Sequence, residues 1–251
     1  MPLISINGGS LFAERFGSGP PRVLALHGWG RRGADFSASL GSLDALALDL
    51  PGFGASPPPA TPMGASGYAE LIGPALAMFD RPPVVVGHSF GGRVAVVREF
   101  LHPGSASGLV LAAAPLVRTS PHRRPPLAHR ALRQANRMGL VSDEMMERRK
   151  RRHGSTDYRT ATGIMRDVLV TAVNESYEEE LRSLQVPVHL VWGSDDVEVP
   201  PRVASEAARI IDGSSSRVEI EVLEGVGHQV PLQAAEALHR AVLEMLDGPA
   251  E

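Results

Sequence analysis

The feature that most constrains the fold is a series of short apolar segments separated by helical patterns. Continuous apolar runs of this length are typical of strands that are buried on both faces of a parallel sheet. Because such strands alternate with helices, the sequence predicts an α/β fold with an open, mostly parallel sheet. The segments are rich in Val, Leu and Ala and lie at Val23–His27, Ala45–Leu50, Val84–Gly87, Leu109–Ala113 and Val186–Trp192.

Three other segments have the patterns of more exposed strands. Leu3–Ile6 and Ser10–Phe16 are joined by Asn-Gly-Gly, which predicts an antiparallel hairpin before the first parallel strand. Between Val218 and Val222, apolar residues alternate with glutamates. That alternation indicates a half-exposed strand near an edge of the sheet.

Helical patterns fill the remainder of the chain. One helix carries the stripe Phe90, Val94, Val97, Leu101, and the last helix carries the stripe Leu232, Ala235, Leu238, Val242, Met245. Between residues 116 and 185 we find no convincing strand. This region has helix-like pieces at Pro126–Met138 and Ser142–Arg152, a third interrupted by Gly163, and a fourth opened by a Ser176-x-x-Glu179 capping box.

The helical region indicates how the domain is organised. An all-helical insertion in an α/β pattern is typical of a cap over the functional edge of the sheet. We therefore expect residues 1–115 and 186–251 to form one core, with residues 116–185 as a cap rather than an independent domain.

Composition excludes several classes of protein. Cysteine is absent, so the chain has no disulfide, no thiolate metal site and no cysteine nucleophile. The formal net charge is −3, from 25 basic and 28 acidic residues, which gives no reason to expect nucleic acid. No stretch approaches the roughly 18 apolar residues of a membrane helix. The first residues lack the pattern of a secretion signal, so we expect a cytoplasmic protein.

The strongest local signal is Gly87-His88-Ser89-Phe90-Gly91, which follows an apolar run and precedes an amphipathic helix. A serine on such a sharp strand-to-helix turn stands clear of the sheet. The flanking Gly87 and Gly91 permit the strained backbone and the close approach of helix to strand. The pattern predicts that Ser89 is a nucleophile.

A serine nucleophile needs a base, and the base needs an acid to orient it. In this order of elements both should follow the ends of later strands. His228 lies just beyond the strand that ends near residue 223, and Asp195 and Asp196 follow the strand that ends at Trp192. Either aspartate could serve. We favour Asp196 because its spacing from Gly193 and Pro200 suits the acid, whereas Asp195 could cap a turn.

Two backbone amides should bind the oxyanion that forms during acyl transfer. One is the amide after the nucleophile, that of Phe90. The second should come from the early loop His27-Gly28-Trp29-Gly30, with the Trp29 amide as the expected donor. We expect His27 and Gly28 to support this loop rather than to react.

In this order and spacing, the motifs resemble those of the α/β-hydrolases. The resemblance implies an eight-stranded sheet, a helical cap after the sixth strand, and a Ser89–His228–Asp196 triad that uses no cofactor and no metal. Because related epoxide hydrolases and haloalkane dehalogenases carry Asp at the position of Ser89, those activities are disfavoured. The motifs are His27-Gly28-Trp29-Gly30, Asp49-Leu50-Pro51-Gly52-Phe53-Gly54-Ala55-Ser56, Gly87-His88-Ser89-Phe90-Gly91-Gly92, Gly193-x-x-Asp196-x-x-x-Pro200 and Gly227-His228.

We expect an enzyme that cleaves carboxylic esters of small or medium size through an acyl-enzyme. The resemblance is equally compatible with other activities, namely those of lactonases, thioesterases, carbon–carbon bond hydrolases and cofactor-free perhydrolases. A slow or non-catalytic ligand sensor of the same fold is an alternative of another class. A second alternative is a dinucleotide site, because Gly28-x-Gly30-x-x-Gly33 is followed at a suitable distance by Asp49.

Charge is distributed unevenly along the chain. Residues 116–185 contain 14 basic and 9 acidic residues, whereas the remainder contains 11 and 19. One interpretation is that these basic residues lie on solvated helix surfaces. The other is that they form a surface that attracts an anionic substrate or an acidic acyl-carrier protein. With the His27-Gly28-Trp29-Gly30 loop, the basic cap is similar to that of the pimeloyl-carrier-protein methyl esterases. The alternative substrate is therefore a carrier-linked methyl ester.

Overall fold

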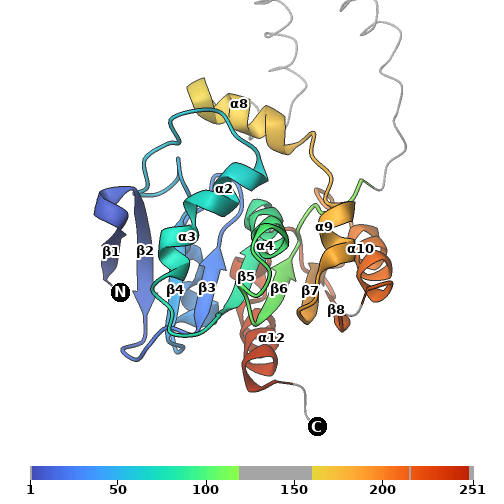
Figure 1. Cartoon of the computed structure of the whole chain (residues 1–251). Coiled ribbons are helices and arrows are strands. Elements are labelled where there is room, and N and C mark those ends of the chain that lie inside the picture. Colours follow the sequence, from blue (N-terminus) through green and yellow to red (C-terminus); the bar gives the residue numbers. More distant parts are fainter. Residues whose placement is uncertain (1, 119–159, 215, 249–251) are drawn as a thin grey trace, which may run out of the picture.

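The computed structural model describes residues 2–118, 160–214 and 216–248. Eight strands form one sheet in the order β1-β2-β4-β3-β5-β6-β7-β8 (Figure 1). The prediction of an eight-stranded, mostly parallel sheet is confirmed. The strands are β1 (Leu3–Ile6), β2 (Leu11–Phe16), β3 (Val23–Leu26), β4 (Ala45–Asp49), β5 (Val84–His88), β6 (Gly108–Ala112), β7 (Val188–Gly193) and β8 (Val218–Leu223).

The centre of the sheet is apolar and the edges are more exposed. Every residue of β3, β4, β5 and β6 is buried, as their continuous apolar runs predict. The strands β1 and β2 form the expected antiparallel hairpin, and β2 runs antiparallel to β4. At the opposite edge, β8 is more exposed than its alternating pattern suggests, because Ile220 and Val222 are 43% and 51% exposed.

Helices cover both faces of the sheet (Figure 1). One layer contains α2 (Ala65–Leu71), α3 (Gly73–Leu76), α4 (Phe90–Leu101), α9 (Glu178–Ser183) and α10 (Arg202–Asp212). The other contains α1 (Ser37–Leu40), α11 (Val230–Gln233) and α12 (Ala235–Asp247), with a 3-10 turn at Gly33–Phe36. The predicted last helix is divided, because Ala234 leaves the helical region with φ −139° and ψ 47°.

The region between β6 and β7 contributes two described helices, α8 (Gly163–Ala172) and α9. Figure 1 shows α8 beyond the carboxyl ends of the strands, whereas α9 packs against α4 and α10. The predicted capping box is wrong, because α9 begins after Tyr177 and no side chain caps it. The helices expected at 126–138 and 142–152 lie outside the described residues, and the extent of the cap stays a prediction.

No helix within residues 2–118, 160–214 and 216–248 has the length and apolar character needed to cross a membrane.

Candidate active site

Ser89 occupies a strained turn between β5 and α4. Its backbone has φ 49° and ψ −112°, and a positive φ is one that residues other than glycine rarely adopt. The two neighbouring glycines permit the tight packing around it. A Cβ at Gly87 would lie 2.5 Å from the Gly92 Cα, and a Cβ at Gly91 would lie 2.1 Å from the Leu26 carbonyl oxygen. The sequence therefore fixes the serine at the carboxyl end of the central strands.

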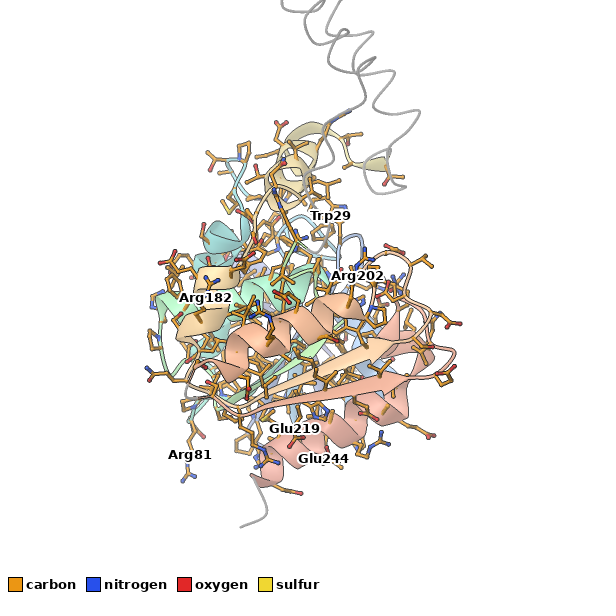
Figure 2. All side chains as sticks on the ribbon, turned by 90° about the vertical axis from the view of Figure 1, so that its right-hand side faces the viewer. Trp29, Arg81, Arg182, Arg202, Glu219 and Glu244 are labelled. Carbon is orange, nitrogen blue, oxygen red and sulfur yellow. The ribbon has the colours of Figure 1, made fainter. Side chains whose placement is uncertain are left out.

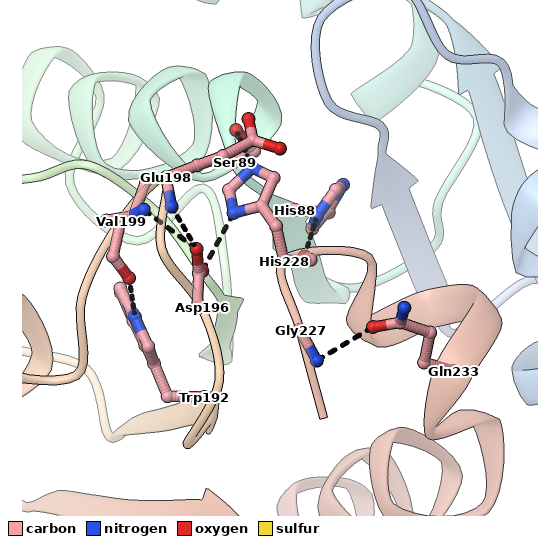
Figure 3. A network of polar contacts seen from close by, with 9 residues as sticks. All are labelled: His88, Ser89, Trp192, Asp196, Glu198, Val199, Gly227, His228 and Gln233. Atoms are coloured by element: carbon pink, nitrogen blue, oxygen red, sulfur yellow. Dashed lines mark hydrogen bonds and ion pairs between the residues drawn. The ribbon is translucent and has the colours of Figure 1, made fainter. Parts of the chain in front are cut away.

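His228 and Asp196 lie next to this serine (Figure 3). The Ser89 Oγ is 3.0 Å from His228 Nε2, and His228 Nδ1 is 2.8 Å from Asp196 Oδ2. Asp196 comes from the loop after β7 and His228 from the loop after β8. Because parallel strands end at one edge of the sheet, residues 139 positions apart in sequence meet there.

The two candidate aspartates have different surroundings. The Asp196 side chain is fully buried, and its Oδ1 accepts hydrogen bonds from the amides of Glu198 and Val199. Asp195 is exposed and accepts a hydrogen bond from the Ser194 hydroxyl. Trp192 donates its indole hydrogen to the Val199 carbonyl and so fixes the same loop. Of the two carboxylates, only that of Asp196 contacts His228.

The two expected oxyanion donors lie on neighbouring segments. Phe90 is the first residue of α4, and its ring contacts the Trp29 ring at a centroid distance of 5.6 Å. Within the described part of the chain, neither amide donates a hydrogen bond. A Cβ on Gly28 would stand 3.2 Å from the Ser89 Cβ, so the Trp29 loop passes directly beside the serine. Two amides are thus free to bind a ligand oxygen near Ser89.

His27 and Asp49 hold the loops around the site. His27 Nδ1 donates to the Gly28 carbonyl and its Nε2 accepts from the Leu50 amide, so the ring is neutral. Asp49 accepts hydrogen bonds from the amides of Gly33 and Ala55 with its two oxygens. The dinucleotide interpretation requires the Asp49 carboxylate to face a ribose, and here it faces the backbone.

His88 is a neighbour of the candidate triad whose contact the sequence did not predict. It is the last residue of β5, it is buried, and its Nε2 donates to the carbonyl of His228 at 2.9 Å. This bond fixes the backbone of the loop that carries His228. The only signal in the sequence is its position beside Ser89, because a histidine in a buried strand gives no indication of its distant partner.

Acid should destabilise the fold through His27 and His88. Burial lowers the pKa of His27 from 6.5 to about 4 and that of His88 from 6.5 to about 3. Between pH 6.5 and 4 the unfolded chain therefore binds protons that the folded chain does not. As the pH is lowered through this window, the free energy of unfolding should decrease, by up to about 1.4 kcal/mol per pH unit for each histidine. Denaturant unfolding between pH 5 and 7 measures this slope.

A variant separates the two contributions. His27→Gln should reduce the slope by the contribution of one histidine, because of these two buried histidines only His88 then remains. A slope that is the same in His27→Gln and the wild type would contradict the assignment.

The comparisons with known proteins agree with this architecture. The alpha/beta hydrolase family matches residues 23–241. A pimeloyl-[acyl-carrier protein] methyl ester esterase from Chromobacterium violaceum is 39% identical over 109 residues, which is 41% of each chain. One of the same name from Neisseria meningitidis is 28% identical over 250 residues, covering 90% of this chain and 94% of that one.

A solved structure has a similar fold over almost the whole chain. A carboxylesterase from Bacillus subtilis aligns with a TM-score of 0.67 at 19% identity, covering 99% of this chain and 91% of that one. The chain belongs to the alpha/beta hydrolase family. It is a hydrolytic enzyme, with relatives named as esterases.

Proposed function

We propose that the protein is a serine esterase that cleaves carboxylic esters of small or medium size, with Ser89, His228 and Asp196 as its catalytic triad. The observation that carries this proposal is the continuous chain of hydrogen bonds from the Ser89 hydroxyl through His228 to the buried Asp196. Such a chain activates an otherwise weakly nucleophilic hydroxyl.

The geometry supports the following mechanism. His228 Nε2 takes the proton of Ser89 as the Oγ attacks the ester carbonyl, and Asp196 stabilises the charged imidazole. The amides of Trp29 and Phe90 bind the oxyanion of the tetrahedral intermediate, each contributing about 3 kcal/mol to the transition state. His228 returns the proton to the departing alcohol. Water, with His228 as base, then hydrolyses the acyl-enzyme.

Aromatic side chains form a connected cluster next to Ser89, which includes Phe90, the residue that follows it. Trp29 contacts Phe53 at a centroid distance of 5.0 Å, and Tyr68 contacts Phe90 at 4.9 Å. The sulfur of Met165 in α8 lies 4.0 Å from the Tyr68 hydroxyl. Trp29 and Phe53 are the partly exposed members of this cluster, so an aliphatic acyl chain that contacts them fits better than a sugar or a charged group.

The direct test is hydrolysis of a panel of p-nitrophenyl esters, lactones and thioesters by the wild type and a Ser89→Ala variant. Sustained Ser89-dependent turnover that is fastest on the esters supports the proposal. If lactones or thioesters are turned over faster than esters, the proposed substrate class is wrong, whereas the proposed triad still holds. A burst without turnover identifies the slow sensor instead.

A carrier-linked methyl ester is the second candidate substrate, because relatives that match this chain are named for that reaction. The excess of basic residues between 116 and 185 suits an acidic carrier protein. On this proposal the carrier is recognised by charge and the ester itself is cleaved by Ser89.

Removing basic residues separates the two substrates. Changing Arg148, Arg149, Arg151 and Arg152 to Gln should lower kcat/KM on a carrier-linked ester at least about tenfold, because charge attraction speeds encounter. Turnover of a small neutral ester should stay unchanged. The control is Arg209→Gln, an exposed arginine of α10. Equal activity of the fourfold variant and the wild type on the carrier-linked ester would rule out recognition through these residues.

A further inference from the structure

We propose that His189, Glu219 and Glu244 bind one divalent transition-metal ion, such as Zn²⁺, at the end of the sheet opposite to Ser89. His189 and Glu219 are the second residues of β7 and β8 and face each other in the strand register. Side chains paired in this way point to the same face of a sheet. Glu244 belongs to α12, which packs on that face. Figure 2 shows Glu219 and Glu244 together, far from Trp29.

The three side chains are spaced for a shared ion. One ligand atom from each lies within 4.8 Å of the others, and His189 Nδ1 is 3.8 Å from Glu244 Oε2. In a zinc site with ligand distances near 2.1 Å, two ligand atoms are about 3.4 Å apart. Rotation of the Glu244 side chain, which is 54% exposed, would close this difference.

His189 has a carboxylate beside each ring nitrogen, at distances longer than a hydrogen bond. The residue is 7% exposed, yet neither ring nitrogen makes a hydrogen bond with any described residue. His189, Glu219 and Glu244 line a cavity of about 1170 Å³ at the amino-terminal ends of the strands. An ion in this cavity would bridge His189 to the facing carboxylates.

A third carboxylate, that of Glu221, is placed to orient the imidazole. His189 Nε2 faces Glu221 Oε2 at 3.9 Å, while Nδ1 faces Glu244. Arg240 binds the other oxygen of Glu221 and so holds this carboxylate in place. Imidazole ligands commonly donate their second N–H to a carboxylate, which fixes the tautomer and the ring. Nδ1 is therefore the expected metal ligand, with Glu221 as a positioning residue.

The ligand chemistry selects the class of ion. Mg²⁺ and Ca²⁺ prefer oxygen ligands alone, whereas an imidazole suits Zn²⁺ and its neighbours. Arg217 pairs with Oε1 of Glu219, which leaves Oε2 of that carboxylate for the ion. Three protein ligands leave one position of a tetrahedral ion for water.

The experiment measures metal binding to the full chain after removal of metal with a chelator. Titration calorimetry with Zn²⁺, repeated as Co²⁺ absorption, should detect one site with a stoichiometry of one. Glu244→Gln and His189→Gln should each weaken this site at least tenfold. Glu221→Gln should weaken it by about 10- to 100-fold, as expected for a residue that orients a ligand. Ser89→Ala should leave it unchanged, so the result does not depend on the esterase proposal.

Controls exclude binding elsewhere, since the chain has nine histidines. Glu236→Gln alters an exposed glutamate of the same helix, and His102→Gln alters an exposed histidine that pairs with Glu70. Both should bind Zn²⁺ like the wild type. If His189→Gln does not fold, the exposed Glu244→Gln decides the question. Absence of a stoichiometric site, or equal binding by Glu244→Gln and the wild type, would overturn the proposal.

Discussion

Replacing Ser89 with alanine should abolish ester hydrolysis, with a fall in kcat of about 10⁶-fold. Losses of this size follow removal of the serine from such a triad, because oxyanion binding alone leaves little of the rate enhancement. Here the hydroxyl lies 3.0 Å from His228 Nε2 at the turn before α4. The measurement is initial-rate hydrolysis of p-nitrophenyl butyrate at saturation. Covalent labelling by a fluorophosphonate probe should disappear with the same change.

The controls separate chemistry from folding. Ser183→Ala removes an exposed hydroxyl at the end of α9 and should retain full activity and labelling. The melting temperature of Ser89→Ala should stay close to that of the wild type, because the hydroxyl contributes a single hydrogen bond. Labelling that persists in folded Ser89→Ala would identify another nucleophile and refute the proposed triad.

Much of the fold could be predicted because the central strands are buried on both faces. Their sequences are continuous apolar runs between turn residues, and the structure buries every residue of β3 to β6. Local signals failed where tertiary contacts decide the outcome. Ser176 has the sequence of a helix cap, but α9 starts later, where Tyr177 packs into the core and its hydroxyl binds Glu175.

The candidate site could be predicted in outline because a parallel sheet brings the ends of its strands together. Ser89, His228 and Asp196 each follow a strand, so chain order alone indicates that they meet. His88 could not be assigned, since its partner is a backbone carbonyl 140 residues away. The proposed metal ligands were invisible for a similar reason. Their proximity depends on the register of β7 with β8 and on the packing of α12.

Changing Asp196 to asparagine should lower kcat by about 10⁴-fold while leaving the fold intact. In Asp196, Oδ1 accepts hydrogen bonds from two backbone amides and Oδ2 faces His228 Nδ1 at 2.8 Å. The asparagine oxygen would keep the two amide bonds, so its NH₂ group would point at Nδ1. Nδ1 would then accept a hydrogen bond, and Nε2 would carry the proton. An imidazole in this tautomer cannot take the proton of Ser89.

Asp195→Asn is the matched control, because Asp195 is the exposed neighbour in the same loop. Its carboxylate accepts a hydrogen bond from the Ser194 hydroxyl, which an asparagine oxygen can also do. This variant should therefore keep kcat near the wild-type value. A comparable loss in both variants would show that the loop, rather than one carboxylate, supports catalysis. A larger loss in Asp195→Asn would transfer the role of the acid to Asp195, which requires His228 to turn away from the buried Asp196.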